Sequence, residues 1–210
     1  MDSALLFRYV LVSLIAYFLG NFATSYIVSM RAAHIDIRKH GSGNAGATNV
    51  LRVLGAKAAA LTFLGDTLKG VAAVLIGRYI AGSNGAILAG LFVVIGHNWP
   101  VTLGFKGGKG VATTIGAMLA INPLLVLVVF SVGAVVLIIT KYVSLASITG
   151  MVIFPITMIL FRQSTEYIIF SFILALLGIF KHRKNIVRLI KGTESKIGKK
   201  TKAVYEEINV

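Results

Sequence analysis

The stretch PLLVLVVFSVGAVVLIIT, from Pro123 to Thr140, contains no charged residue. A helix needs about 20 apolar residues to cross the hydrocarbon core of a bilayer, and fewer when it is tilted or packed inside protein. We therefore expect this stretch to form a membrane-spanning helix.

Six further apolar stretches flank it on both sides. They cover residues 5–30, 56–80, 85–98, 110–121, 143–161 and 165–180. The third and fourth spans in chain order are short, so we expect them to be partly re-entrant or shielded from lipid by neighbouring helices. The predicted fold is an all-α, polytopic integral membrane protein with about seven transmembrane helices. We expect one helical membrane domain at residues 1–194 and a polar, basic cytoplasmic tail at residues 195–210.

The composition excludes several classes of protein. With 57% hydrophobic and 13% charged residues, the chain is too apolar for an ordinary water-soluble domain. A secretory signal peptide does not explain this, because apolar stretches recur along the chain. The absence of cysteine rules out a disulfide framework, a thiolate metal site and a cysteine nucleophile. The net charge of +14 is spread between the apolar segments, so anionic lipid headgroups and phosphorylated small molecules are better partners than nucleic acid.

Basic residues in the short connections predict the orientation, because cytoplasmic loops carry the excess of Lys and Arg. The segments that follow the first, third, fifth and seventh predicted spans hold Arg31, Arg38, Lys39, Arg52, Lys57, Lys106, Lys109, Lys141, Lys181, Arg183, Lys184, Arg188, Lys191, Lys196, Lys199, Lys200 and Lys202. The opposite side holds Arg8, Arg78 and Arg162. We therefore expect the amino terminus outside and the carboxyl terminus in the cytoplasm.

Glycine-rich, polar stretches gather on the same basic side, at residues 41–52, 96–114, 141–147 and 181–194. The first matches the GxGxxG spacing of a dinucleotide site, but no strand precedes it, so a Rossmann fold is rejected. The second lacks the first glycine and the final Ser or Thr of a Walker motif, which is also rejected. Glycine loops before helices can still bind phosphate through backbone N–H groups and the positive helix end. Because four such loops lie on one face, a phosphate site is a better interpretation than tight helix turns alone.

Asp66 and Lys69 lie three residues apart in the second predicted span, so they share one helix face. An unpaired charge at mid-membrane costs at least ~2.5 kcal/mol. We expect the two to neutralise each other or to face a polar cavity, and we favour a structural role over direct catalysis.

The polar stretches resemble the bacterial acyl-phosphate:glycerol-3-phosphate acyltransferases, the PlsY family. The resemblance spans nearly the whole chain and rests on SGNAGATNVLR from Ser42, GHNWP from Gly96, FKGGKGVAT from Phe105, KYVSLAS from Lys141 and HRKNIVRLIKGTE from His182. It implies a seven-helix, multi-pass enzyme of the bacterial plasma membrane with its active site on the cytoplasmic side. Such an enzyme transfers a fatty acyl group from acyl phosphate to the 1-hydroxyl of glycerol 3-phosphate, which yields lysophosphatidic acid and phosphate for phospholipid synthesis.

The resemblance also implies the site residues. From the first motif the phosphate-binding positions are Ser42, Gly43, Asn44, Gly46, Thr48, Asn49 and Arg52. From the second they are His97, Lys106, Gly107, Gly108, Lys109 and Gly110. Further lining is expected from Ser144, Ser147, His182 and Asn185. No cofactor or metal is implied, and a monomer is expected.

A mechanism that fits these residues holds two phosphorylated substrates side by side. We assign Arg52 and Lys109 to glycerol 3-phosphate, with support from Ser147, His182 and Asn185. The backbones around Gly43 and Gly108 are assigned to acyl phosphate, and the acyl chain to an apolar groove between helices. Catalysis is expected from His182, Lys109, Arg52 and Asn185, without an acyl-enzyme. His182 is the best protein candidate for general base, although a substrate phosphate oxygen is an alternative.

A transporter of organic anions or phosphate esters is the alternative function. It would account equally well for the charge and the spans. It predicts polar groups near the bilayer midplane, however, whereas the polar clusters of this chain lie at one face.

Overall fold

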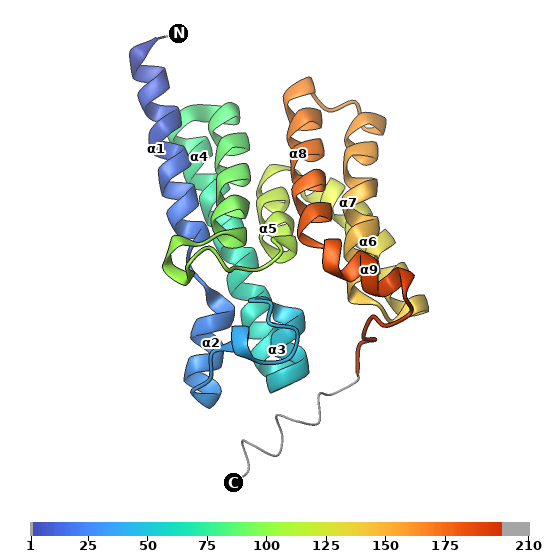
Figure 1. The fold of residues 1–210 in the computed structure, drawn as a ribbon. Coiled ribbons are helices and arrows are strands. Elements are labelled where there is room, and N and C mark those ends of the chain that lie inside the picture. The colour runs from blue at the N-terminus through green and yellow to red at the C-terminus, as the bar shows by residue number, and fades with distance from the viewer. Residues whose placement is uncertain (1, 199–210) are drawn as a thin grey trace.

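The computed structural model describes residues 2–198, and within that range every regular element is a helix (Figure 1). The predicted tail at 195–210 lies outside the described residues from position 199 onward. The long helices are α1 (Ser3–Gly20), α4 (Ala56–Asn98), α5 (Val111–Ile121), α6 (Pro123–Thr140), α7 (Val143–Leu160) and α8 (Thr165–Lys181). The shorter helices are α2 (Thr24–Ala33), α3 (Ala47–Leu54) and α9 (Arg183–Ile190), with 3-10 turns η1 (Ile37–Lys39) and η2 (Val101–Leu103).

The four predicted spans between residues 110 and 180 agree with α5 to α8 within one residue at each end. Helix α6 has Asn122 as its N-cap and proline at its first position, which is a favourable helix start. The predicted spans at 56–80 and 85–98 form the two halves of α4. The backbone leaves the helical region at Ala81 and Gly82, and the second half folds back beside the first (Figure 1).

The prediction that residues 5–30 form a single helix was wrong. Helix α1 ends at Gly20, and α2 begins at Thr24. The Asn21 side chain donates a hydrogen bond to Tyr17 O (2.7 Å), and Lys69 Nζ donates to Gly20 O (3.1 Å). Lys69 thus satisfies a carbonyl at the helix end, and Tyr17 O accepts from both the backbone and the side chain of Asn21, which together stabilise the break.

By length and apolarity, four segments of the described chain could cross a membrane: Ser3–Ala33, Ala56–Leu103, Pro123–Thr140 and Val143–Leu160. A fifth is added if α8 and α9, bent by 60°, count as one span. The first two segments contain the breaks described above. The number of crossings and the orientation therefore stay predictions.

Small residues let the central helices pack closely. A Cβ on Gly20 of α1 would collide with the backbone of Val93, and one on Gly70 would collide with the backbone of Thr113 in α5. Such contacts are typical of helices packed in membranes. Large apolar side chains such as Leu127, Ile138 and Leu176 remain exposed on the outer faces of α6 and α8, where lipid would cover them.

Candidate active site

A polar cavity of about 180 Å³ lies where α3, α4 and the starts of α5, α7 and α9 meet. Most of the predicted site residues line it: Ser42, Asn44, Gly46, Thr48, Asn49, Arg52, His97, Lys109, Gly110, Ser144, Ser147, His182 and Asn185. Residues from four separate motifs thus converge on one space. Its basic side chains make it suitable for anions.

Four predicted binding residues do not line this cavity. Gly43 lies in the adjoining turn with a φ of +71°. Lys106 is exposed to solvent. Gly107 and Gly108 pack against His97 and line a much smaller cavity. Their backbones support the loop that carries Lys109, and the structure does not place them on the polar cavity.

Asn49 braces the first motif. Its amide nitrogen donates to Ile37 O (3.1 Å) and His40 O (3.0 Å), and its oxygen accepts from the Ser42 backbone N–H (2.8 Å). Buried amides are stabilised by such complete pairing. Asn49 therefore orders the loop around Ser42, and its polar atoms are already used within the protein.

Two cations, Lys109 and Arg52, line the cavity. Lys109 lies in the loop before α5, and its ammonium donates a hydrogen bond to Asn185 Oδ1. Burial lowers the pKa of Lys109 to about 8, and Arg52 and Arg188 act in the same direction against Glu194. Burial also lowers the pKa of Arg52, although an arginine stays charged at any physiological pH. Both side chains can therefore bind a phosphate at neutral pH.

Glu194 is the site residue that the sequence analysis missed. Its Oε1 accepts hydrogen bonds from Ser144 Oγ (3.0 Å) and Asn185 Nδ2 (2.8 Å). Arg188 Nε lies 2.6 Å from Oε2. Burial opposes ionisation of Glu194, but these three hydrogen bonds outweigh it and lower the pKa. The signal available in the sequence was that Glu194 is the single acid between residues 181 and 202.

His182 lies after the end of α8, beyond the predicted span, and only 2% of it is exposed. Its Nδ1 lies 2.8 Å from Gly178 O. Because a carbonyl only accepts, Nδ1 carries the proton and the neutral ring has a bare Nε2. Burial and the nearby Lys109 lower the pKa of His182 to about 4. At neutral pH the ring can therefore accept a proton or a hydrogen bond at Nε2.

An apolar cavity of about 360 Å³ adjoins the polar one. The two share Phe63, Val111, Val143 and Ser147 as lining residues. The apolar cavity continues between α5, α6 and α7, past Met118, Phe130 and Phe154, among other side chains. A ligand with a charged head and a hydrocarbon chain could occupy both cavities at once.

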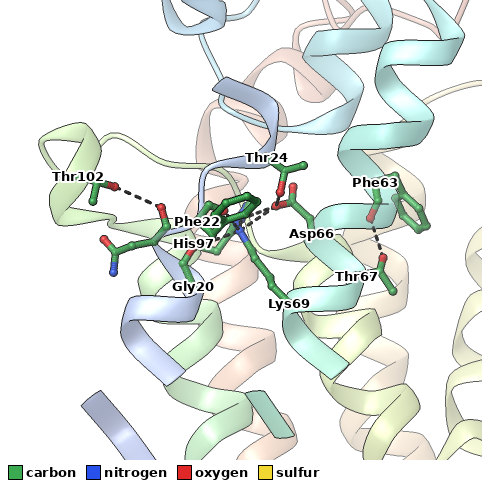
Figure 2. Close-up of polar contacts among 10 residues, drawn as sticks. Gly20, Phe22, Thr24, Phe63, Asp66, Thr67, Lys69, His97 and Thr102 are labelled. Carbon is green, nitrogen blue, oxygen red and sulfur yellow. Dashed lines mark hydrogen bonds and ion pairs between the residues drawn. The ribbon is translucent and has the colours of Figure 1, made fainter. Parts of the chain in front are cut away.

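Figure 2 shows the buried ion pair on α4. Asp66 Oδ1 lies 2.8 Å from Lys69 Nζ, so the predicted pairing of these two charges is confirmed. Asp66 also lies 3.4 Å from Nδ1 of His97. Asp66 and His97 both line the polar cavity, so the ion pair borders it directly.

Comparison with known proteins gives a consistent result. The family described as "Glycerol-3-phosphate acyltransferase" matches residues 10–192. A glycerol-3-phosphate acyltransferase of Alkaliphilus metalliredigens is 58% identical over 191 residues, which cover 91% of this chain and 97% of the relative. One of Clostridioides difficile is 53% identical over 201 residues, covering 93% and 98%. The crystal structure of PlsY (YgiH), an integral membrane glycerol 3-phosphate acyltransferase in its glycerol 3-phosphate form, superposes with a TM-score of 0.86 at 36% identity, covering 90% of this chain and 96% of that one.

Proposed function

The chain belongs to the glycerol-3-phosphate acyltransferase family, and from that premise we propose that it takes its acyl group from acyl phosphate and transfers it directly to glycerol 3-phosphate. The observation that carries this proposal is the continuity of a cationic cavity with an apolar one. A short anionic acceptor fits the first, and a donor with a phosphate head and a fatty chain fits both.

Glycerol 3-phosphate is assigned to Arg52 and Lys109. The guanidinium suits bidentate binding of a phosphate, and the ammonium adds a second charge. Ser147, His182 and Asn185 line the same space and can orient the glycerol hydroxyls. Asn185 is held by Glu194 and bonded to Lys109, so these three groups act as one unit.

Acyl phosphate is assigned to the part of the first motif around Gly46 and to the start of α5, both of which line the polar cavity. The free N–H groups at a helix start favour a phosphate. The chain would then extend into the apolar cavity, where each buried methylene contributes ~0.8 kcal/mol.

The transfer forms one bond and breaks another. The 1-hydroxyl oxygen attacks the carbonyl carbon, the new ester bond forms, and the bond between that carbon and the phosphate oxygen breaks. The hydroxyl proton passes to His182 Nε2 or to a phosphate oxygen. Because phosphate is a good leaving group, positioning and charge stabilisation by Arg52 and Lys109 supply the catalysis.

We place the enzyme in the bacterial plasma membrane as a monomer, with this site at the cytoplasmic face. The functional test uses purified protein with acyl phosphate and glycerol 3-phosphate, and it measures lysophosphatidic acid and inorganic phosphate. Equal amounts of both products are expected, and acyl-CoA should not replace acyl phosphate. Uptake of glycerol 3-phosphate into protein-containing vesicles without any lysophosphatidic acid would instead indicate a transporter.

A further inference from the structure

Helix α9 has two faces of different character. Its inner face carries the buried Asn185, which lines the polar cavity, and the helix packs against α7 and α8. On the opposite face, Val187 and Ile190 are 50% and 81% exposed. Residues three or four positions apart share one side of a helix, so the exposed Arg183 and Lys191 lie on this face too. These four residues are called the outer face of α9.

The outer face continues the exposed apolar stripe of α8. Large apolar side chains that are at least 38% exposed recur along α8 at intervals of three or four residues: Ile169, Phe172, Ile173, Leu176 and Phe180. At the end of this stripe, the Arg183 guanidinium lies 4.5 Å from the centre of the Phe180 ring and donates to Phe180 O (3.1 Å). The apolar surface that lipid covers on α8 thus leads directly to the outer face of α9.

The direction of α9 suits a helix at the membrane surface. The chain bends by 60° between α8 and α9. In Figure 1, α9 turns aside from α8 toward the ends of α6 and α7. If α8 crosses the bilayer, as the sequence predicts, α9 lies closer to the membrane plane than to the bilayer normal. A short amphipathic helix with basic residues is typical of the layer where headgroups meet acyl chains.

The charges around the apolar pair favour anionic headgroups. Arg183 and Lys191 are exposed on the outer face, and the exposed Lys184 lies at its edge. Arg188 is paired with Glu194 and belongs to the cavity side. Each basic residue close to an anionic membrane strengthens binding by about fivefold. A soluble partner fits less well, because the outer face is continuous with a surface that lipid covers.

We propose that the outer face of α9 binds the headgroup layer of an anionic bilayer. Its two apolar side chains lie among the upper parts of the acyl chains, and Arg183 and Lys191 contact phospholipid phosphates. This inference goes beyond the proposed function, since the partner is the bilayer and not a substrate. The membrane surface then supports, from outside, the helix that carries Asn185 into the cavity.

The test reads lipid contact from a fluorophore at the centre of the outer face. Ile190→Cys in this cysteine-free chain is labelled with bimane, and the full-length protein is reconstituted into vesicles of equal parts phosphatidylglycerol and phosphatidylcholine. In one preparation only the phosphatidylglycerol is brominated, and in the other only the phosphatidylcholine. Both lipids should quench the fluorophore, and brominated phosphatidylglycerol should quench it about two- to fivefold more strongly.

Three controls use the same two preparations. Bimane at Leu176→Cys, on the apolar stripe of α8, should be quenched by both lipids. Bimane at Lys39→Cys, an exposed position in η1, should be quenched by neither. Arg183→Gln/Lys191→Gln, combined with Ile190→Cys, should lose most of the excess quenching by phosphatidylglycerol. Because all these positions are at the surface, their unfolding temperatures should stay close to that of the wild type.

The possible outcomes separate this inference from its alternatives. No quenching at position 190 would show that water, a second copy or a soluble protein covers the outer face, and it would overturn the proposal. Equal quenching by the two lipids would also overturn it, because the basic residues would then not select anionic headgroups. Excess quenching that persists in Arg183→Gln/Lys191→Gln would contradict the assigned contacts. The measurement needs no substrate, so its failure is distinct from a failure of the acyl-transfer assay.

Discussion

At the scale of single residues, anion binding in the polar cavity depends on a few cations that are hydrogen-bonded to other residues of the protein. Lys109 is bonded to Asn185, and Arg52 Nη2 donates to Ser195 O at 3.3 Å. Replacing either cation by alanine removes a charged hydrogen-bond donor worth ~1.5–3 kcal/mol, so kcat/KM for glycerol 3-phosphate should fall at least about tenfold. Steady-state kinetics on protein with an unchanged unfolding temperature would measure this.

Lys184→Ala is the matched control for these charge removals. Lys184 is exposed on α9, close in sequence to His182 and Asn185, and it does not line the cavity. Its loss should change kcat/KM by less than about twofold, as for other exposed charges. If it reduced activity as strongly as Arg52→Ala, general positive charge rather than the cavity would explain binding.

The pKa of Lys109 predicts a pH dependence. Burial lowers this pKa to about 8, so the ammonium is fully charged well below pH 8 and is lost as the pH rises through that value. A phosphate monoester, with a second pKa of about 6, stays a dianion over this range. The kcat/KM for glycerol 3-phosphate should therefore fall with an apparent pKa near 8 in the free enzyme.

Lys109→Arg is the control for this pH dependence, because its guanidinium stays charged. Whatever activity the variant keeps should lose the decline near pH 8. A wild-type profile that stays flat to pH 10 would show that the Lys109 charge does not limit binding.

At the scale of elements, the sequence predicted the uninterrupted helices well. The stretch from Pro123 to Thr140 and its neighbours are apolar on all sides and bounded by polar residues, so their ends could be placed closely. The break after Gly20 was not predicted: Gly20 and Asn21 are residues that often end helices, but the partner that satisfies Gly20 O is Lys69, which is 49 residues away in the chain. Such long-range capping leaves no local signal.

In the site, too, some features had a local sequence signal and others depended on contacts between distant residues. The residues that meet at the cavity were found from motifs that share one face of the protein. Only the loop geometry shows that Asn49 orders the turn around Ser42. It also shows that Gly107 and Gly108 line a separate, smaller cavity next to His97. Glu194 was missed because an acid is unexpected in a phosphate site. Its function is to hold Ser144 and Asn185, which only the folded contacts show.

The packing of α4 against α5 gives a prediction for stability. A Cβ on Gly70 would collide with the backbone of Thr113 and Ala117, so Gly70→Ala must push the helices apart. We expect a loss of about 1–3 kcal/mol in the free energy of unfolding, as for other overpacked sites. Gly150→Ala is the control, since its Cβ would approach Val129 only to 3.6 Å. Equal unfolding temperatures for the two variants would contradict this account of the interface.

At the scale of the whole molecule, the motif loops are expected on one membrane face and the amino terminus on the other. The chain has no cysteine, so single cysteines can be introduced as reporters. Ser42→Cys and Ser195→Cys should react with a membrane-impermeant thiol reagent only from the cytoplasmic side, and Ser3→Cys only from outside. All three serines are exposed. Labelling of positions 3 and 42 from the same side would refute the predicted orientation.

The joined cavities also predict how the two substrates meet. The cationic cavity and the apolar cavity share Ser147 and Phe63, so acceptor and donor can be bound together, with the carbonyl at the junction. The hydroxyl of Ser147 donates to Val143 O (2.9 Å), and that of Ser144 donates to Glu194. Neither hydroxyl is bonded to a histidine that could activate it as a nucleophile.

Direct transfer within one ternary complex should therefore give intersecting lines in double-reciprocal plots, rather than the parallel lines of a ping-pong scheme. Without glycerol 3-phosphate, radiolabelled acyl phosphate should leave no acyl group on the denatured protein. Ser147→Ala should keep measurable activity, because it loses a binding contact and not a nucleophile. Stoichiometric label on Ser42, Ser144 or Ser147 would establish an acyl-enzyme. That result would reject direct transfer, while the assignment of the two cavities to the two substrates would still hold.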